Sequence, residues 1–183
     1  MMEEHLCPWW LAYTFDNPLR RVVHKPERIL SGLVRPGFTA LDLGCGFGHF
    51  TIPMARMVGE EGHVIAVDLQ AQMLERARRR AVRAGIQSRI RFHQSGREQI
   101  GVSEAVDFAL AFWMVHEVHD KESFLRELVA LLKPHSRFLM VEPRVHVGSA
   151  SFNLTVETAH RVGMQTLSEV KIAWSRAVLF APA

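Results

Sequence analysis

Apolar runs and amphipathic segments alternate along this chain from residue 38 onward, and the alternation predicts its secondary structure. Short, continuously apolar runs predict buried strands at 38–43, 63–69, 89–94, 105–113 and 136–143. Helical spacing of the apolar positions predicts helices at about 50–58, 71–85, 121–134 and 149–163. Because strands that alternate with helices form right-handed crossovers, this order favours a parallel sheet.

Two of the predicted helices have marked ends. Gly85 is the expected stop of the helix at 71–85, and Pro134 is the expected end of the helix at 121–134. The first of these helices is amphipathic, and its apolar positions are expected to face the core: Met73, Leu74, Ala77, Ala81 and Val82.

The C-terminal tail breaks the alternation. Residues 164–174 and 175–183 read as two strands with almost nothing between them, which predicts an antiparallel pair at the edge of the sheet. The expected fold is therefore a doubly wound, Rossmann-like α/β sheet of seven strands, mostly parallel with a C-terminal antiparallel hairpin. Residues 38–183 would form this domain. Residues 1–37 would form an N-terminal extension, with a helix around 26–34.

Composition fits one soluble domain. The chain has 183 residues, 48% of them hydrophobic and 22% charged, which is ordinary for a globular protein. Net charge is +3 and the isoelectric point is about 9.2, a mild basic bias that is compatible with an anionic small molecule. The two cysteines, Cys7 and Cys45, form no paired motif, so a disulfide framework or structural zinc site is not expected.

The chain also carries no signal for a membrane or for export. It opens MMEEHLCPWW, which is acidic where a secretory signal is basic. Its longest apolar run, FALAFWMV at 108–115, is far shorter than a membrane span. We therefore expect a cytoplasmic protein without a membrane partner.

The stretch ALDLGCGFGHF, residues 40–50, places three alternating glycines after the first strand. In doubly wound sheets, ligands bind beyond the carboxyl ends of the strands, so this loop is expected to hold one. Dinucleotide-binding folds use the spacing GxGxxG, whereas this loop reads GxGxG with His49 at the third glycine position. Asp68 ends the second strand, twenty residues after Gly48, and is placed to accept from ribose hydroxyls of either cofactor class.

ALDLGCGFGHF followed by VIAVDLQAQML resembles the first two motifs of the class I S-adenosylmethionine-dependent methyltransferases. The stretch VDFALAFWMVHEVHDKESFLRELVALLKPHSRFLMVEP is similar to the later motifs of that superfamily, especially in the branch that includes the ubiquinone and menaquinone C-methyltransferases. The resemblance covers roughly residues 38–145. It implies S-adenosylmethionine as cofactor, S-adenosylhomocysteine as product, and in-line methyl transfer to a small-molecule acceptor.

The resemblance also implies a cofactor site. Its glycines would approach the methionine part, Asp42 would organise the loop or receive the ammonium group, and Asp68 would bind the ribose. The family usually has an acid after the third strand, but this chain has HQSGREQ there, so a serine hydroxyl or backbone carbonyl would substitute. The implied cofactor residues are Asp42, Gly44, Gly46, Gly48, Asp68, Leu69, Met73, Ser95, Gly96, Arg97 and Phe112. Taken alone, Asp68 is equally a candidate N-cap and Met73 a candidate core residue.

Candidate catalytic residues follow the fourth strand in FWMVHEVHD, residues 112–120. His116 and Glu117 are the candidates for a general base or a substrate-positioning group. A metal site built on His116 and His119 is not favoured, because HExH lacks the HExxH spacing. Asp120 is the expected N-cap of the next helix. The fifth strand ends EPRVHV, which brings Glu142, Arg144 and His146 near the same edge, with Arg144 either binding an anionic group or solvated.

Other interpretations remain open at this point. A NAD-dependent oxidoreductase is the first rival, disfavoured by the missing third glycine, and a catalytically silent S-adenosylmethionine-binding module is the second. The arginines of 75–83 are expected to form a solvated helix face, so no nucleic-acid partner is predicted. The extension holds four aromatic residues that would form a lid or bury themselves in a homodimer: Trp9, Trp10, Tyr13 and Phe15.

Overall fold

A computed structural model of the chain describes residues 23–183. The aromatic residues of the extension, and Cys7, lie outside the described residues. The helices are α3 (Pro26–Ile29), α4 (Thr51–Met57), α5 (Ala71–Arg83), α6 (Lys121–Leu131) and α7 (Ser149–Arg161), with short 3-10 turns η1 (Gln87–Arg89) and η2 (Val115–Glu117). The strands are β1 (Thr39–Leu43), β2 (His63–Asp68), β3 (Ile90–Gln94), β4 (Val106–Phe112), β5 (Leu132–Pro143), β6 (Met164–Glu169) and β7 (Ser175–Pro182).

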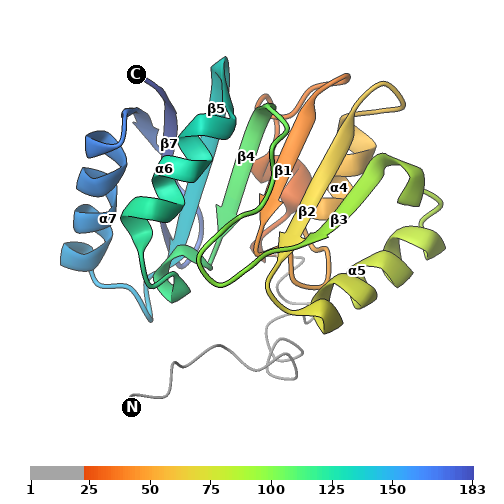
Figure 1. Ribbon diagram of the computed structural model, residues 1–183, viewed down its shortest axis with the longest axis horizontal. Helices are drawn as coiled ribbons and strands as arrows, with labels where there is room; N and C mark the ends of the chain where they lie inside the picture. Colours follow the sequence, from red (N-terminus) through yellow and green to blue (C-terminus); the bar gives the residue numbers. More distant parts are fainter. Residues whose placement is uncertain (1–22) are drawn as a thin grey trace.

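The strands form one seven-stranded sheet in the order β3-β2-β1-β4-β5-β7-β6 (Figure 1). Strands β1 to β5 are parallel, whereas β7 runs antiparallel to both β5 and β6. This confirms the predicted doubly wound sheet and its C-terminal hairpin. The strand order reverses between β1 and β4, and Leu43 at the end of β1 pairs with Val67 on one side and Ala111 on the other. The glycine loop therefore leaves the sheet at its topological switch point.

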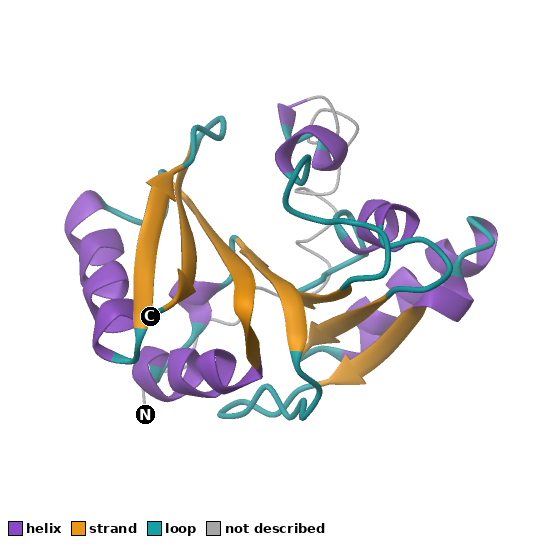
Figure 2. Ribbon diagram, turned by 90° about the horizontal axis from the view of Figure 1, so that it is seen from above, coloured by secondary structure: helices purple, strands orange, loops and turns teal. Residues whose placement is uncertain are grey.

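Helices cover both faces of the sheet and create two hydrophobic cores (Figure 2). On one face, α6 and α7 bury Leu125, Leu128, Phe152 and Ala159 against strand residues such as Leu41, Ile65 and Phe138. On the other face, α3, α4 and α5 pack against alternate strand residues, including Ala40, Val64, Phe108, Leu110 and Leu139. Because both faces are covered, the central strands are apolar throughout.

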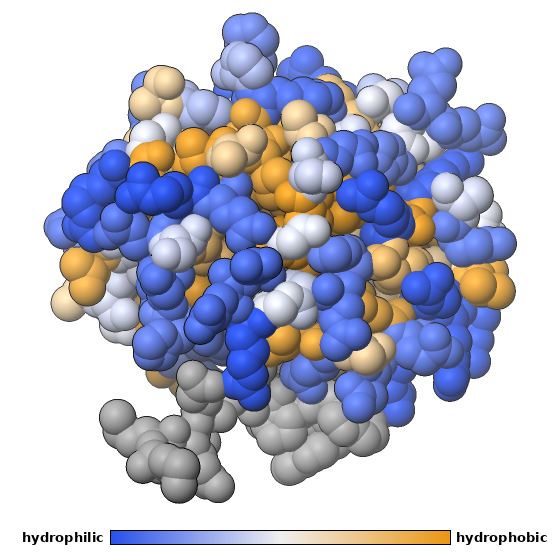
Figure 3. Space-filling model, viewed as in Figure 1, coloured by the Kyte–Doolittle hydropathy of each residue, from blue (hydrophilic) through white to orange (hydrophobic). Residues whose placement is uncertain are grey.

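No helix connects β3 to β4. A loop over residues 95–105 crosses the sheet instead, and its Ile100 and Val102 are buried in the core beneath α6. On the face shown in Figure 3, hydrophilic residues dominate, and hydrophobic colour gathers over the middle of the sheet, where this loop replaces a helix. Within residues 23–183, no helix combines the length and the apolarity that crossing a bilayer requires.

The junction of α6 and β5 differs from the prediction. The helix ends at Leu131, and Pro134 lies inside β5 rather than at the helix end. A proline disfavours helical backbone in the residue before it, so the chain turns extended ahead of Pro134. The pairing between β4 and β5 is irregular here, shifting between Val106 and Phe108, which accommodates a residue without an N–H.

Three smaller expectations also need correction. Val82 is 56% exposed, because it lies one position beyond the apolar stripe of α5 whose other four predicted residues are buried. The helix expected over 26–34 is only the four-residue α3. The strand expected at 164–174 ends at Glu169, and residues 170–174 form the connection to β7.

Candidate active site

The glycine loop between β1 and α4 has a backbone that side chains rarely adopt. Gly44, Gly46 and Gly48 have φ of 66°, 53° and 81°. A Cβ added at Gly44 would lie 2.8 Å from Met114 Cβ, so this position excludes a side chain twice, by conformation and by space. Among residues 23–183, nothing lies within 4 Å of a Cβ added at Gly46. No described residue therefore covers the backbone at Gly46.

Asp68 holds the loop from the neighbouring strand. Its Oδ2 accepts a hydrogen bond from Gly46 N–H and its Oδ1 accepts one from Gln70 N–H, both at 2.9 Å. The N-cap position of α5 is occupied by Gln70, so Asp68 does not have the alternative role of N-cap. Asp68 is 9% exposed, and burial raises its pKa against the opposing effect of these backbone hydrogen bonds.

Asp42 places a second carboxylate beside the loop. It is 2% exposed and accepts a hydrogen bond from Thr51 Oγ1 at 2.5 Å, at the first residue of α4. Burial raises the pKa of the Cys45 thiol well above its usual value, and the charges of Asp68 and Asp42 add to the increase. The thiol is therefore neutral, and the loop is lined by two buried acids.

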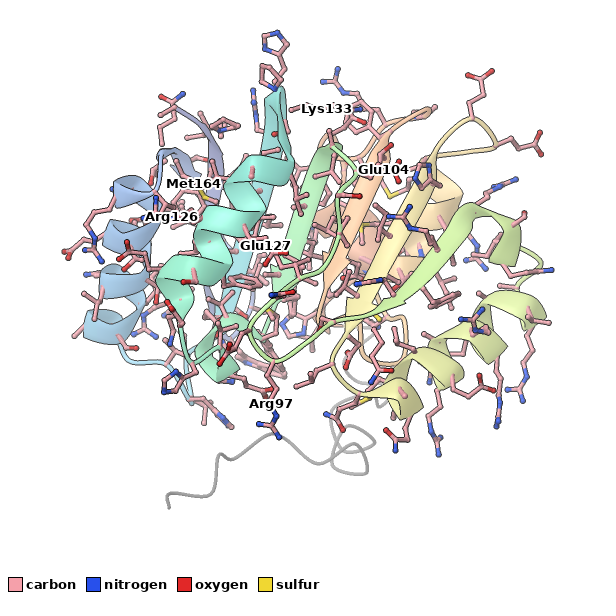
Figure 4. All side chains as sticks on the ribbon, in the orientation of Figure 1. Arg97, Glu104, Arg126, Glu127, Lys133 and Met164 are labelled. Carbon is pink, nitrogen blue, oxygen red and sulfur yellow. The ribbon has the colours of Figure 1, made fainter. Side chains whose placement is uncertain are left out.

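The residues expected beside the adenine lie around the ends of β2, β3 and β4. Met73 is buried on α5, as its core interpretation requires, and Leu69 is half-buried. Ser95 follows β3 and donates its N–H to the carbonyl of Asp68 at 3.1 Å. Arg97 is exposed and lies at the edge where the parallel strands end, opposite the edge that carries Glu104 and Lys133 (Figure 4).

Phe112, the last residue of β4, is buried in an aromatic cluster. Its ring centroid lies 4.4 Å from that of Phe50 and 5.2 Å from that of His24. His24 is fully buried, bonds through Nε2 to the carbonyl of Ala173, and accepts a hydrogen bond from the His49 ring on its own carbonyl. The end of the N-terminal extension is thereby fixed to the glycine loop.

Trp113 and Trp174 have the only positive φ values among non-glycine residues of the described chain, 62° and 56°. The indole N–H of Trp113 donates to Ser175 Oγ at 3.0 Å, and the backbone N–H of Trp113 donates to the Val141 carbonyl at 2.7 Å. Bulky residues in this conformation are strained, and such strain concentrates at functional sites.

His116 and Glu117 lie on η2, directly after β4, as their sequence position predicts. His116 Nδ1 lies 2.5 Å from Glu142 Oε2, and its Nε2 lies 4.0 Å from Glu117 Oε1. Burial lowers the pKa of His116, but the hydrogen bond and charge of Glu142, together with the charge of Glu117, outweigh it and leave the pKa raised. Burial also raises the pKa of Glu117. The positive charge of His116 lowers this pKa, whereas the negative charges of Asp68 and Glu142 raise it further. His116, Glu117 and Glu142 thus lie close enough for the charge of each to change the pKa of its neighbours.

Two contacts of the site were missed by sequence reasoning. The pairing of Glu142 with His116 was not predicted, although both residues were expected at the same edge of the sheet: Glu142 lies one residue before the end of β5, and His116 follows the neighbouring strand β4. Arg80 was expected on a solvated face, but its guanidinium donates to the Phe47 carbonyl at 3.1 Å and lies 5.6 Å from the Phe47 ring centroid. Arg80 lies three residues after Ala77 and seven after Met73, and this helical spacing is the signal in the sequence that sets it apart from exposed Arg78 and Arg79.

The remaining candidates have local roles. Asp120 caps α6 by accepting from Ser123 N–H at 2.9 Å, as predicted. Arg144 is exposed and donates to the Ser175 carbonyl. Over residues 23–183, no three histidine, cysteine, aspartate or glutamate side chains are grouped closely enough to hold a metal ion.

Comparison with known proteins agrees with this geometry. A family model described as "Methyltransferase domain" matches residues 35–174. The chain belongs to this methyltransferase family. The match confirms the resemblance to the class I S-adenosylmethionine-dependent methyltransferases, whose cofactor is S-adenosylmethionine.

Individual relatives extend the comparison. The ubiquinone/menaquinone biosynthesis C-methyltransferase UbiE of Vibrio vulnificus is 35% identical over 109 residues, covering 59% of this chain and 42% of that protein. The chain thus spans less than half the length of the curated relatives it matches. A SAM-dependent methyltransferase from Aquifex aeolicus has the same fold, with a TM-score of 0.85 and 24% identity over 96% of this chain and 98% of that one. The [4+2]-cyclase SpnF shares the fold at a TM-score of 0.69 and 18% identity, over 84% of this chain and 60% of its own.

The residues present fit the cofactor that the family implies. S-Adenosylmethionine carries a sulfonium and an ammonium group, and buried carboxylates attract such cations. A dinucleotide instead places its pyrophosphate at the start of the helix after the glycine loop. In this chain Asp42 lies at that point, bonded to Thr51, so a pyrophosphate would meet a negative charge. The loop therefore suits a cationic methyl donor better than a dinucleotide.

Proposed function

We propose that the protein transfers a methyl group from S-adenosylmethionine to a small-molecule acceptor. The observation that carries the proposal is the pair of buried carboxylates, Asp42 and Asp68, at a glycine loop in which none of residues 23–183 would contact a Cβ at Gly46. When bound, S-adenosylmethionine supplies an electrophilic methyl group on a positively charged sulfur. The acids and the loop would bind and orient the donor, and orientation supplies much of the rate of an in-line displacement.

Within this proposal, the residues have separate tasks. Asp68 would accept from the ribose hydroxyls with Leu69 and Met73 beside the adenine, and Gly44, Gly46 and Gly48 would approach the methionine part. The adenine would be bordered by Ser95, Gly96 and Arg97, which replace the acid usual at this position. Phe112, at the end of β4, would support the cofactor site from below the adenine and the glycine loop. His116 and Glu117, on the turn after β4, would face the acceptor.

We also propose that residues 1–37 act as a lid over the donor, leading into the domain of 38–183. Supporting this, His24 in the described part of the extension is buried against the ring of Phe112 and bonded to His49 beside the glycine loop. A lid here would exclude water from the reacting atoms.

Methyl transfer can be tested directly. The purified chain is incubated with S-adenosylmethionine and a panel of small hydroxyl, carbon-acid, amine and thiol acceptors, and S-adenosylhomocysteine is measured by mass spectrometry. We expect acceptor-dependent product formation that Asp68→Asn abolishes. Binding of the donor without product from any acceptor class, also at high enzyme concentration, would favour the silent module.

A further inference from the structure

Glu142 contacts both the backbone and the side chain of the turn after β4. Its Oε1 accepts a hydrogen bond from Val115 N–H at 2.8 Å, and its Oε2 lies 2.5 Å from His116 Nδ1. The Glu142 side chain is 3% exposed, so water does not compete for these contacts. An ionised carboxylate can only accept hydrogen bonds, so with Glu142 as a carboxylate the shared proton belongs to Nδ1.

With Nδ1–H held in this way, Nε2 keeps its lone pair and becomes the only ring atom that can take up a proton. Nε2 lies on the side of Glu117, 4.0 Å from its Oε1. The titratable groups around the ring are Glu142 from β5, Glu117 from the same turn, Lys121 from α6, and His146 after β5, whose ring centroid is 6.1 Å away. The two carboxylates stabilise a positive ring, which strengthens Nε2 as a base.

We propose that Glu142 is a positioning residue that makes His116 Nε2 the proton acceptor of the reaction, and that the methyl acceptor is therefore a hydroxyl compound or a carbon acid. This inference rests on the proposed function. The acceptor's proton passes to Nε2, and its freed electron pair forms the bond to the methyl carbon. The carbon–sulfur bond breaks and leaves its electron pair on sulfur. An acceptor that has a lone pair and no proton to lose, such as a tertiary amine, gains nothing from this arrangement.

The first test uses the wild-type protein and no acceptor. Long-range proton–nitrogen NMR spectra of the histidine rings report which nitrogen carries the proton, and His116→Gln assigns the signal. At a pH above the His116 titration, we expect the proton on Nδ1. A proton on Nε2 would mean that a neutral Glu142 donates to Nδ1, and it would overturn the proposal.

The second test replaces the carboxylate with an amide of the same size. In Glu142→Gln one of the two carboxylate oxygens becomes an amide NH2, which cannot accept a hydrogen bond, so either Val115 N–H or the Nδ1–H of His116 loses its acceptor. We expect the titration midpoint of His116 to move to lower pH, because the negative charge that stabilises the imidazolium is gone. Glu157→Gln, at an exposed position on α7, is the matched control and should leave the midpoint unchanged.

An unchanged midpoint in folded Glu142→Gln would overturn the role of Glu142. If that variant does not fold, the wild-type tautomer decides alone. Neither spectrum depends on the methyl donor, so a protein that fails to bind S-adenosylmethionine refutes the proposed function and leaves this test intact. Once an acceptor is known, Glu142→Gln should lower kcat about 10–100-fold with the KM for the donor unchanged, and shift the rising limb of the pH profile downward. Preferential methylation of tertiary amines would contradict the acceptor class.

Discussion

Two aspartates decide the chemistry of the glycine loop at the scale of single residues. Asp42 and Asp68 are charged groups withdrawn from water, and each is held by hydrogen bonds from its surroundings. Buried charges are rare unless they are bonded or serve a ligand. Their position beside Gly46 gives the loop a negative character that matches a cationic donor.

Asp68→Asn should weaken binding of S-adenosylhomocysteine at least tenfold, since a tenfold loss corresponds to about 1.4 kcal/mol, the worth of one hydrogen bond to a charged group. Calorimetric titration measures the affinity. Burial raises the pKa of Asp68, so this carboxylate takes up its proton at a higher pH than an ordinary aspartate. As the pH is lowered, the affinity of the wild-type protein should therefore begin to fall at a higher pH than the usual range of aspartate protonation. The amide that replaces the carboxylate does not titrate, so this dependence should vanish in the variant.

Asp107→Asn is the matched control for this variant. Asp107 lies at the start of β4, at the opposite edge of the sheet, and accepts hydrogen bonds from Thr39 N–H and Lys133. The control should lose stability and keep its affinity. Equal loss of affinity in both variants would mean that Asp68 acts only through the fold.

Gly44→Ala should destabilise the protein more than Gly85→Ala. Both glycines have positive φ, 66° and 67°, so both variants incur the conformational cost of about 1–2 kcal/mol. Only at Gly44 does the new Cβ also collide with Met114, whereas Gly85 has nothing within 4 Å. Chemical denaturation measures both free energies of unfolding. Equal losses would show that the contact with Met114 relaxes freely.

At the scale of elements, a helix side chain substitutes for missing secondary structure. The loop over 95–105 has no helix of its own, yet Glu127 on α6 accepts hydrogen bonds from Ile100 N–H and Gly101 N–H, both at 2.8 Å. Figure 4 shows Glu127 on the side of α6 that faces this loop. One carboxylate thereby fixes the turn that carries Ile100 into the core.

Glu127→Ala should lower the free energy of unfolding by about 1–3 kcal/mol, because two backbone N–H groups lose their acceptor. Hydrogen exchange of residues 98–103 should become faster than in the wild type, as measured by mass spectrometry. Glu122→Ala on the same helix is the control. Glu122 makes an exposed pair with Arg126, so its loss should change stability by less than about 0.5 kcal/mol and leave exchange in the loop unchanged.

Element boundaries show where sequence patterns were sufficient. For most strand ends of β1 to β5, the apolar runs predicted the boundary to within one residue. Both faces of the central strands are buried, so each of these is a nearly continuous run of apolar residues. The end of α6 was predicted too late in the chain, because a proline disfavours helical backbone in the residue before it. Pro134 also lies within β5, where the pairing of β5 with β4 is irregular. The β6 strand, exposed at the edge, has a weak pattern, and its early end at Glu169 was not visible.

At the scale of the whole molecule, topology brings the site together. The doubly wound order could be predicted from the alternation of strands and helices, and it places the glycine loop, Asp68 and the turn of His116 at one edge. The contacts within that edge depend on side-chain geometry. The bond of Glu142 to His116 and that of Arg80 to Phe47 cross between elements whose relative orientation no local pattern encodes.

The most direct measurement is calorimetric titration of the purified protein with S-adenosylmethionine, S-adenosylhomocysteine and NADH in parallel. We predict saturable, micromolar binding of the first two and no heat from NADH, because the carboxylates of Asp42 and Asp68 attract the cationic donor and repel a pyrophosphate. Tight binding of NADH, with no response to S-adenosylmethionine or S-adenosylhomocysteine, would contradict the cofactor assignment and the methyl transfer that follows from it.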